Sequence, residues 1–175
     1  VLLNLGITSG WFGPIQVLLA EQAKQISPDN KELVLSTVLT AGALVSTICN
    51  PLWGAFSDRT LLRVGRRLPW ALAGVVGGAI ALLLQSQADS VLMLVLAWCG
   101  VQLTLNMGYA AVTASVPDQV PVARRGVVGG LIALAGTLGV LLGVTIADLT
   151  DSIASGYAVI AGVLDVRGNA EINGA

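Results

Sequence analysis

Polar side chains inside otherwise apolar segments are the residues of this sequence best suited to binding chemistry. Two sets share this character: Asn4, Thr8, Trp11 and Gln16 in the first segment, and Trp98, Gln102, Asn106 and Tyr109 in a later one. Asn4, Thr8 and Trp11 are spaced i, i+4 and i+7, so they share one face of a helix. The later set keeps spacings of four, four and three and also shares a face. Amides pair with hydroxyl groups as donors and acceptors, and aromatic rings pack on the C–H side of a pyranose, so the pattern favours a sugar site.

Each of these sets has a structural alternative. Amides in membrane helices also bond neighbouring helices, and Gln102 and Asn106 could serve only that purpose. Trp11 could contact lipid or fill space between helices. The carboxylates nearest the apolar segments, Glu21 and Asp148, lie at segment ends, where water can solvate them. We therefore expect no proton-carrying carboxylate at the middle of these segments.

Charged side chains gather in two short linkers. The first linker carries Arg59, Arg63, Arg66 and Arg67, and the second carries Arg124 and Arg125, which together are six of the nine basic residues. Asp58 ends the apolar segment before the first linker, where a carboxylate needs an arginine or a helix N-terminus as its partner. Gly54 allows a neighbouring helix to approach closely, and Gly65 permits a turn. The spacing predicts a charge-stabilised elbow between two helices.

Composition excludes several classes of protein. The chain has 175 residues, of which 55% are hydrophobic and only 11% are charged, against about 25% charged in soluble domains. So few charges cannot cover the surface of a soluble globule. The absence of histidine excludes an imidazole metal site and a Ser-His-Asp triad. With no phosphate-binding loop or nucleophile–base pair either, we expect no enzyme activity, no cofactor, no metal and no nucleic-acid partner.

The apolar segments predict an all-α membrane protein, a polytopic bundle of five to six transmembrane helices. A spanning helix needs about 20 mostly apolar residues, and five segments meet this length: 1–20, 33–56, 68–87, 91–116 and 126–147. A sixth segment, 153–164, is too short, and polar residues from Asp165 onward stop it. We expect the first helix to lack its start and the sixth to be incomplete. Cys49 and Cys99 lie inside apolar runs and are expected to be buried thiols.

The distribution of basic residues predicts the orientation of the chain in the cell membrane. Short loops rich in Lys and Arg stay on the cytoplasmic side, whereas the remaining linkers are acidic or mixed. The amino terminus and both arginine-rich linkers are therefore expected to be cytoplasmic. Orientation alone is one interpretation of these arginines, and a role in the elbow is the other.

Prolines interrupt two of the apolar segments, and small residues recur at regular spacing in the fifth segment. Pro14 and Pro51 interrupt the first two segments, where each removes a backbone hydrogen bond and kinks the helix. Small residues recur every four positions in the fifth segment: Ala135, Gly139, Gly143 and Ala147, with Gly126 and Gly130 as a similar pair near its start. Such ridges let helices pack closely, and packing is their expected role.

The two arginine linkers also carry a family resemblance. Gly54, Asp58 and Arg59, followed by Gly65, Arg66 and Arg67, resemble the signature loop of the major facilitator superfamily. The longer spacing here, SDRT-x-x-R-x-GRR-x-PW, looks like the branch of glycoside–cation and sucrose–cation symporters. The second linker, with Pro117, Asp118, Pro121, Arg124 and Arg125, resembles a loop of the same branch, and the segment from Gly13 to Gln16 looks like its first helix.

The resemblance implies that residues 1–164 are the N-terminal six-helix half of a twelve-helix transporter, followed by a polar tail over residues 165–175. Its implied partners are a small solute such as a sugar or glycoside, a coupling cation, the lipid bilayer and a second six-helix half. The signature-loop residues would act in gating. Two alternatives stay open: a non-transporting fragment or membrane subunit without its partner half, and a drug exporter of the same superfamily.

Overall fold

The computed structural model describes the backbone of residues 1–60 and 67–173, and the side chains of this part as far as residue 165. The first long helix combines α1 (Leu2–Gly13), a π-helical turn (Pro14–Leu18) and α2 (Leu19–Ile26). The other helices are α3 (Lys31–Arg59), α4 (Leu68–Gln85), α5 (Val91–Gln119), α6 (Arg125–Leu149) and α7 (Ile153–Asn173). Short 3₁₀ turns at Pro28–Asn30 and Val122–Arg124 precede α3 and α6. The described part contains no strand, which confirms the predicted all-α class.

Within the described residues, five helices are long and apolar enough to cross a membrane, as the sequence predicts. They cover Leu2–Ile26, Pro28–Arg59, Leu68–Gln85, Val91–Gln119 and Val122–Leu149. In the sixth segment the apolar part is Ile153–Asp165, but the backbone remains helical as far as Asn173. The polar residues after Leu164 therefore end the apolar run and not the helix, because most polar side chains cost a helix only a few tenths of a kcal/mol each.

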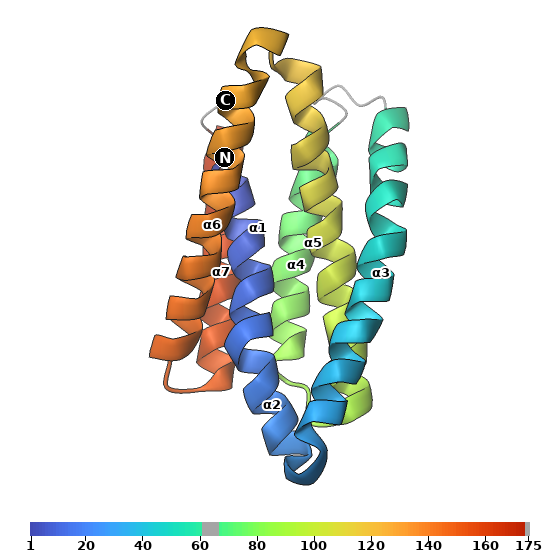
Figure 1. Ribbon diagram of the computed structural model, residues 1–175, viewed down its shortest axis with the longest axis vertical. Coiled ribbons are helices and arrows are strands. Elements are labelled where there is room, and N and C mark those ends of the chain that lie inside the picture. The colour runs from blue at the N-terminus through green and yellow to red at the C-terminus, as the bar shows by residue number, and fades with distance from the viewer. Residues whose placement is uncertain (61–66, 174–175) are drawn as a thin grey trace.

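The helices alternate in direction, so the loops fall into two groups (Figure 1). The connections α3–α4 and α5–α6 lie at one end of the bundle, which we call the arginine end because Arg59, Arg67, Arg124 and Arg125 lie there. The connections α2–α3, α4–α5 and α6–α7 lie at the other, acidic end, with Asp89, Asp148 and Asp151. This alternation is the one predicted; which end faces the cytoplasm stays a prediction.

The packing repeats between the two halves of the chain. In the first half the helices are α1, α3 and α4, and in the second half they are α5, α6 and α7. α1 contacts α6 and α7 of the second half's set, and α5 contacts the corresponding helices of the first half, α3 and α4. α1 and α5 are therefore the central helices, α3 and α6 flank them, and α4 contacts α7 on the remaining side. Two three-helix units related in this way are a known arrangement of six-helix membrane bundles.

The small-residue ridge of α6 has the predicted packing role, and the structure identifies α1 as the helix it packs against. A Cβ atom added to Gly139 would lie 2.5 Å from the Leu5 carbonyl oxygen, and one added to Gly143 would lie 2.6 Å from that of Ser9. These contacts are with backbone atoms, so neither position tolerates a larger residue without separating the helices. Gly126 and Gly130 differ, since a Cβ at either would meet nothing within 4 Å; no helix described here packs on this pair.

The two prolines inside the first two spans differ in their effect on the helix, and neither cysteine is fully buried. Pro14 begins the π-helical turn between α1 and α2, which confirms an irregularity in the first helix. α3 continues without a break across Pro51. Cys49 of α3 and Cys99 of α5 are free thiols, but each is only partly buried, not fully buried as expected.

A buried polar cluster joins three helices at the acidic end. The Tyr157 hydroxyl of α7 donates to Gln22 Oε1 over 2.7 Å, and Gln22 Nε2 donates to the Gln85 carbonyl oxygen at the end of α4 over 2.9 Å. All three residues are buried. Both polar ends of the Gln22 amide are thereby paired, and because breaking a buried hydrogen bond is costly, these two bonds fix how the ends of α2, α4 and α7 meet.

Candidate functional site

The predicted polar face of α1 lines a cavity between α1, α5 and α6. Its volume is about 320 Å³, and it is partly open to the surroundings of the bundle. The lining residues are Asn4, Thr8, Trp11, Phe12, Tyr109, Gly129, Ile132, Ala133 and Gly136. The structure thus brings together four of the eight predicted binding residues, three from α1 and one from α5.

Asn4 contributes an unpaired acceptor to this cavity. The residue is 4% exposed, and its Nδ2 donates to the Ile132 carbonyl oxygen of α6 over 3.0 Å. Its Oδ1 is buried and has no hydrogen-bond partner. A buried acceptor left unpaired costs about 1–3 kcal/mol, so a ligand that donates a hydrogen bond here would recover that free energy.

Trp11 contributes an unpaired donor beside an aromatic wall. The Trp11 and Tyr109 rings meet edge to face, with centroids 5.4 Å apart and planes at 63°. The Trp11 Nε1 is buried without a partner. Thr8 is already satisfied, because its hydroxyl donates to the Asn4 carbonyl oxygen one turn earlier. The cavity therefore offers one buried unpaired acceptor, one buried unpaired donor and three aromatic side chains, those of Trp11, Phe12 and Tyr109.

The other predicted binding residues do not line this cavity. Trp98 is fully buried, and its ring lies against Gly42 of α3. Asn106 Nδ2 donates to the Gln102 carbonyl oxygen over 2.7 Å and to Gln102 Oε1 over 3.2 Å. Gln16 is exposed on the π-helical turn. A substrate-binding role for these four residues stays a prediction.

Sequence reasoning missed the α6 wall of the cavity, formed by Gly129, Ile132, Ala133 and Gly136. These residues carry no polar side chain, so their chemistry gave no signal. The spacing of Gly129, Ala133 and Gly136, at i, i+4 and i+7, was the available sign that three small residues share one helix face.

A second candidate site lies at the arginine end, where Arg67 joins three polar groups. Arg67 Nη2 lies 2.6 Å from Asp58 Oδ1, and its Nε lies 2.9 Å from Asp118 Oδ2. Its Nη1 donates to the Ser57 hydroxyl. The side chain of Arg67 is only 10% exposed. One guanidinium therefore connects the end of α3, the start of α4 and the end of α5.

This arrangement confirms an arginine as the partner of Asp58 and adds Ser57 and Asp118 to the elbow. Arg125 donates from Nε to the Val120 carbonyl oxygen over 3.0 Å and from Nη2 to that of Pro117 over 2.9 Å. Arg59 and Arg124 are exposed. A Cβ on Gly54 would meet nothing within 4 Å, so the predicted close approach is not made by any described helix. Arg63, Gly65 and Arg66 lie outside the described residues.

Aromatic side chains also connect the end of α3 with the start of α4. The rings of Trp53 and Trp70 lie 5.5 Å apart, and Phe56 stacks on Trp70 at 6.2 Å and 11°. Trp70 Nε1 donates to the Thr60 hydroxyl over 2.8 Å, and Trp53 Nε1 donates to the Leu103 carbonyl oxygen of α5 over 3.0 Å. The end of α3 is thereby fixed to both α4 and α5.

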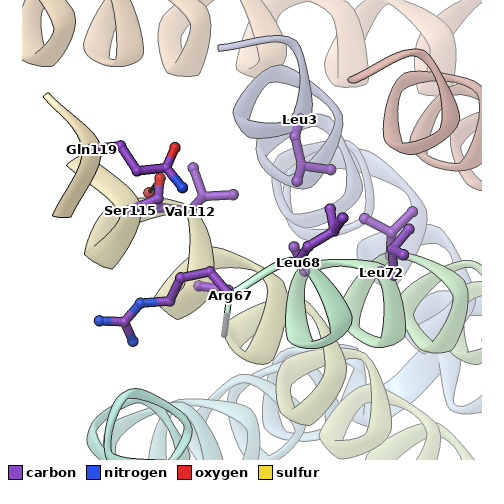
Figure 2. A pocket seen from close by; sticks show the side chains of 10 residues that line it. Leu3, Arg67, Leu68, Leu72, Val112, Ser115 and Gln119 are labelled. Carbon is purple, nitrogen blue, oxygen red and sulfur yellow. Dashed lines mark hydrogen bonds between the residues drawn. The ribbon is translucent and has the colours of Figure 1, made fainter. Parts of the chain in front are cut away.

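A smaller cavity of about 190 Å³ lies next to Arg67, between α1, α4 and α5. Figure 2 shows Leu3 of α1 and two leucines of α4, Leu68 and Leu72, facing Ser115 and Gln119 of α5 across the space. The Arg67–Asp118 contact therefore joins α4 to α5 at the edge of this cavity.

Comparison with known families gives one match. The sequence model of the Major Facilitator Superfamily matches residues 2–164, a range that includes both candidate sites. No curated protein matches the chain.

Proposed function

The chain belongs to the Major Facilitator Superfamily, and from this premise we propose that it is one half of a secondary transporter for a small neutral solute, a sugar or glycoside. The superfamily consists of transporters rather than enzymes, and the helices make the chain a multi-pass membrane protein. We propose that transport proceeds by alternating access and is driven by a cation gradient.

The cavity between α1, α5 and α6 carries the proposal of a neutral solute. None of its lining residues has a carboxylate, ammonium or guanidinium group. A charged solute would lose its hydration there without gaining a counter-charge, which is costly. A hydroxylated solute would instead pair with Asn4 Oδ1 and Trp11 Nε1, the buried groups without partners among the residues that line this cavity. The resemblance of both arginine linkers to glycoside–cation symporters supports the same class.

A second six-helix half is the proposed cover for the open side of the bundle. Apolar residues are exposed along α3 (Leu44, Ile48, Leu52 and Phe56) and along α6 (Leu131, Leu134, Leu138 and Leu141). Lipid could cover these side chains alone, but the unpaired polar groups of the nearby cavity are costly in lipid. Two halves related by an axis along the membrane normal would enclose the cavity between them.

The arginine end supports a gating role in this scheme. We propose that it faces the cytoplasm, because short arginine-rich loops stay there. The Arg67 contacts with Asp58 and Asp118 would hold α3, α4 and α5 as one unit while the two halves rock. Since the cavity of this half lacks a carboxylate, we place the group that couples the cation in the second half.

The test is reconstitution in liposomes with a proton or sodium gradient and labelled glucosides and disaccharides. We expect accumulation when this chain is combined with a second-half polypeptide, and none with this chain alone.

The variant Trp11→Phe removes the indole donor and keeps an aromatic ring, so it should weaken uptake by the combined halves. Gly162→Ala is the control, because a Cβ there meets nothing within 4 Å. Accumulation by this chain alone, or a Trp11→Phe protein with full uptake, would contradict the proposal; absence of uptake in every combination would favour a non-transporting subunit.

A further inference from the structure

Helix α6 carries two rows of small residues with different surroundings. The row Ala135, Gly139, Gly143 and Ala147 is buried, and its two glycines touch the backbone of α1. The second row, Gly129, Ala133 and Gly136, lines the cavity instead. A Cβ on Gly129 would meet nothing within 4 Å, and one on Gly136 would lie 3.5 Å from Asn4 Nδ2, an ordinary contact. Packing within the described bundle therefore requires small residues in the first row only.

The second row faces polar groups that lack partners. Asn4 is 4% exposed with an unpaired Oδ1, and the Trp11 Nε1 is also buried and unpaired. Both residues line the same cavity as the small-residue row. Small residues alone would not indicate a ligand, but a buried unpaired donor and a buried unpaired acceptor on residues that line the same cavity do, because a ligand that pairs with them recovers the cost of leaving them unpaired.

We propose that Gly129, Ala133 and Gly136 form a size-selecting wall that admits one sugar ring to this cavity. One ring hydroxyl donates to Asn4 Oδ1, another accepts from Trp11 Nε1, and the ring lies beside the Trp11–Tyr109 pair. The volume of about 320 Å³ is at the lower end of ligand pockets, which run from about 300 to 1,000 Å³. A disaccharide or glycoside would place one ring here and the remainder toward the open side. The inference rests on the proposed function, since it takes this cavity as the solute site.

Larger side chains on this wall should narrow the cavity without disturbing the bundle. Ala133 is exposed and lines the cavity, so Ala133→Leu adds three carbon atoms to the space. Gly136→Ala adds one carbon atom in ordinary contact distance. Gly126→Ala is the matched control, because Gly126 lies on the same helix, outside the cavity lining, with open space around its Cβ position.

Access to the cavity is measured with two uncharged thiol reagents of different size. The full chain carries Phe12→Cys, a lining position, with Cys49→Ser and Cys99→Ser, and is purified in detergent. Methyl methanethiosulfonate and benzyl methanethiosulfonate are the small and large probes. We expect Ala133→Leu to slow the reaction of the benzyl reagent by about tenfold or more relative to that of the methyl reagent. The reason is that a difference of one methylene group in a pocket already changes the rate by about tenfold or more. Gly136→Ala should have a smaller effect in the same direction, and Gly126→Ala none.

Glucose and the trisaccharide raffinose then test the occupant. Glucose should protect the thiol introduced by Phe12→Cys when the wall is unchanged, and Ala133→Leu should abolish that protection. A single, unshifted peak in size-exclusion chromatography, matching that of the parent protein, shows that a variant is folded. If Ala133→Leu and Gly136→Ala leave the ratio of the benzyl to the methyl rate as it is in the parent protein, the size-selecting wall is overturned, whether or not glucose protects the thiol. Size-dependent slowing without protection by glucose or raffinose would support the wall and count against a sugar as the transported solute.

Discussion

The Arg67 bridge predicts that Asp118 contributes more to stability than Asp58. Both carboxylates contact the same guanidinium, at 2.9 Å and 2.6 Å respectively. Their exposure differs, since the side chain of Asp118 is 23% exposed and that of Asp58 is 58% exposed. Solvent screens the exposed pair strongly, so the shorter distance does not decide which contact stabilises the fold more.

The magnitudes follow from this difference in exposure. A charge-assisted hydrogen bond that is largely buried contributes about 1.5–3 kcal/mol, and Asp118→Asn keeps a neutral acceptor, so we expect a loss of about 1–2 kcal/mol. An exposed ion pair contributes about 0–1 kcal/mol, which is the expected loss for Asp58→Asn. With about 2–4 °C for each kcal/mol in a chain of this size, Asp118→Asn should lower the melting temperature by about 2–8 °C.

The assay is thermal unfolding of the purified chain in detergent, followed by tryptophan fluorescence. A double-mutant cycle with Arg67→Met isolates the Arg67–Asp118 pair from the other interactions of Asp118. Arg124→Gln is the control, because Arg124 is exposed, and it should change stability by less than about 0.5 kcal/mol. Raising the salt concentration should weaken the exposed Asp58 pair more than the Asp118 pair.

Two results would refute this reasoning. An Asp58→Asn protein that is destabilised as much as Asp118→Asn would show that burial does not rank the two contacts. A coupling energy between Arg67 and Asp118 within about 0.3–0.5 kcal/mol of zero, the range seen for independent sites, would show that the bridge does not join α4 to α5.

Three further predictions concern packing and gating. Gly42→Ala should cost about 1–3 kcal/mol and shift the tryptophan emission, because its Cβ would overlap the buried indole nitrogen of Trp98; Gly54→Ala on the same helix, with open space, should change neither. Gly143→Ala should reduce the yield of folded protein in size-exclusion chromatography, since its Cβ would lie 2.6 Å from a backbone oxygen of α1, whereas Gly126→Ala should behave as wild type. In a protein with both halves, Asp58→Asn should reduce uptake far more than membrane expression, and near-normal uptake would show that Asp58 has no gating role.

Local sequence patterns were sufficient to predict the helices and the distribution of charge between the loops. The segment predicted at 68–87 is α4, Leu68–Gln85, and the segment predicted at 91–116 is α5, which extends to Gln119. These features are local, because the length of an apolar run decides whether a helix can span a bilayer. The same locality explains the errors at helix ends: α2 continues to Ile26 and α7 to Asn173, since polar residues end an apolar run without ending a helix.

The packing of the helices, in contrast, was needed to show which polar residues share a site. Asn4, Thr8 and Trp11 share a helix face, as their spacing predicted, but only the packing of α5 and α6 on α1 sets Tyr109 beside them and leaves Trp98 against Gly42. It also separated the two small-residue rows of α6, of which one touches α1 and one borders a cavity. Helical periodicity fixes which residues lie on one face, but the approach of neighbouring helices fixes what that face contacts, because side chains far apart in the chain meet only in the folded bundle.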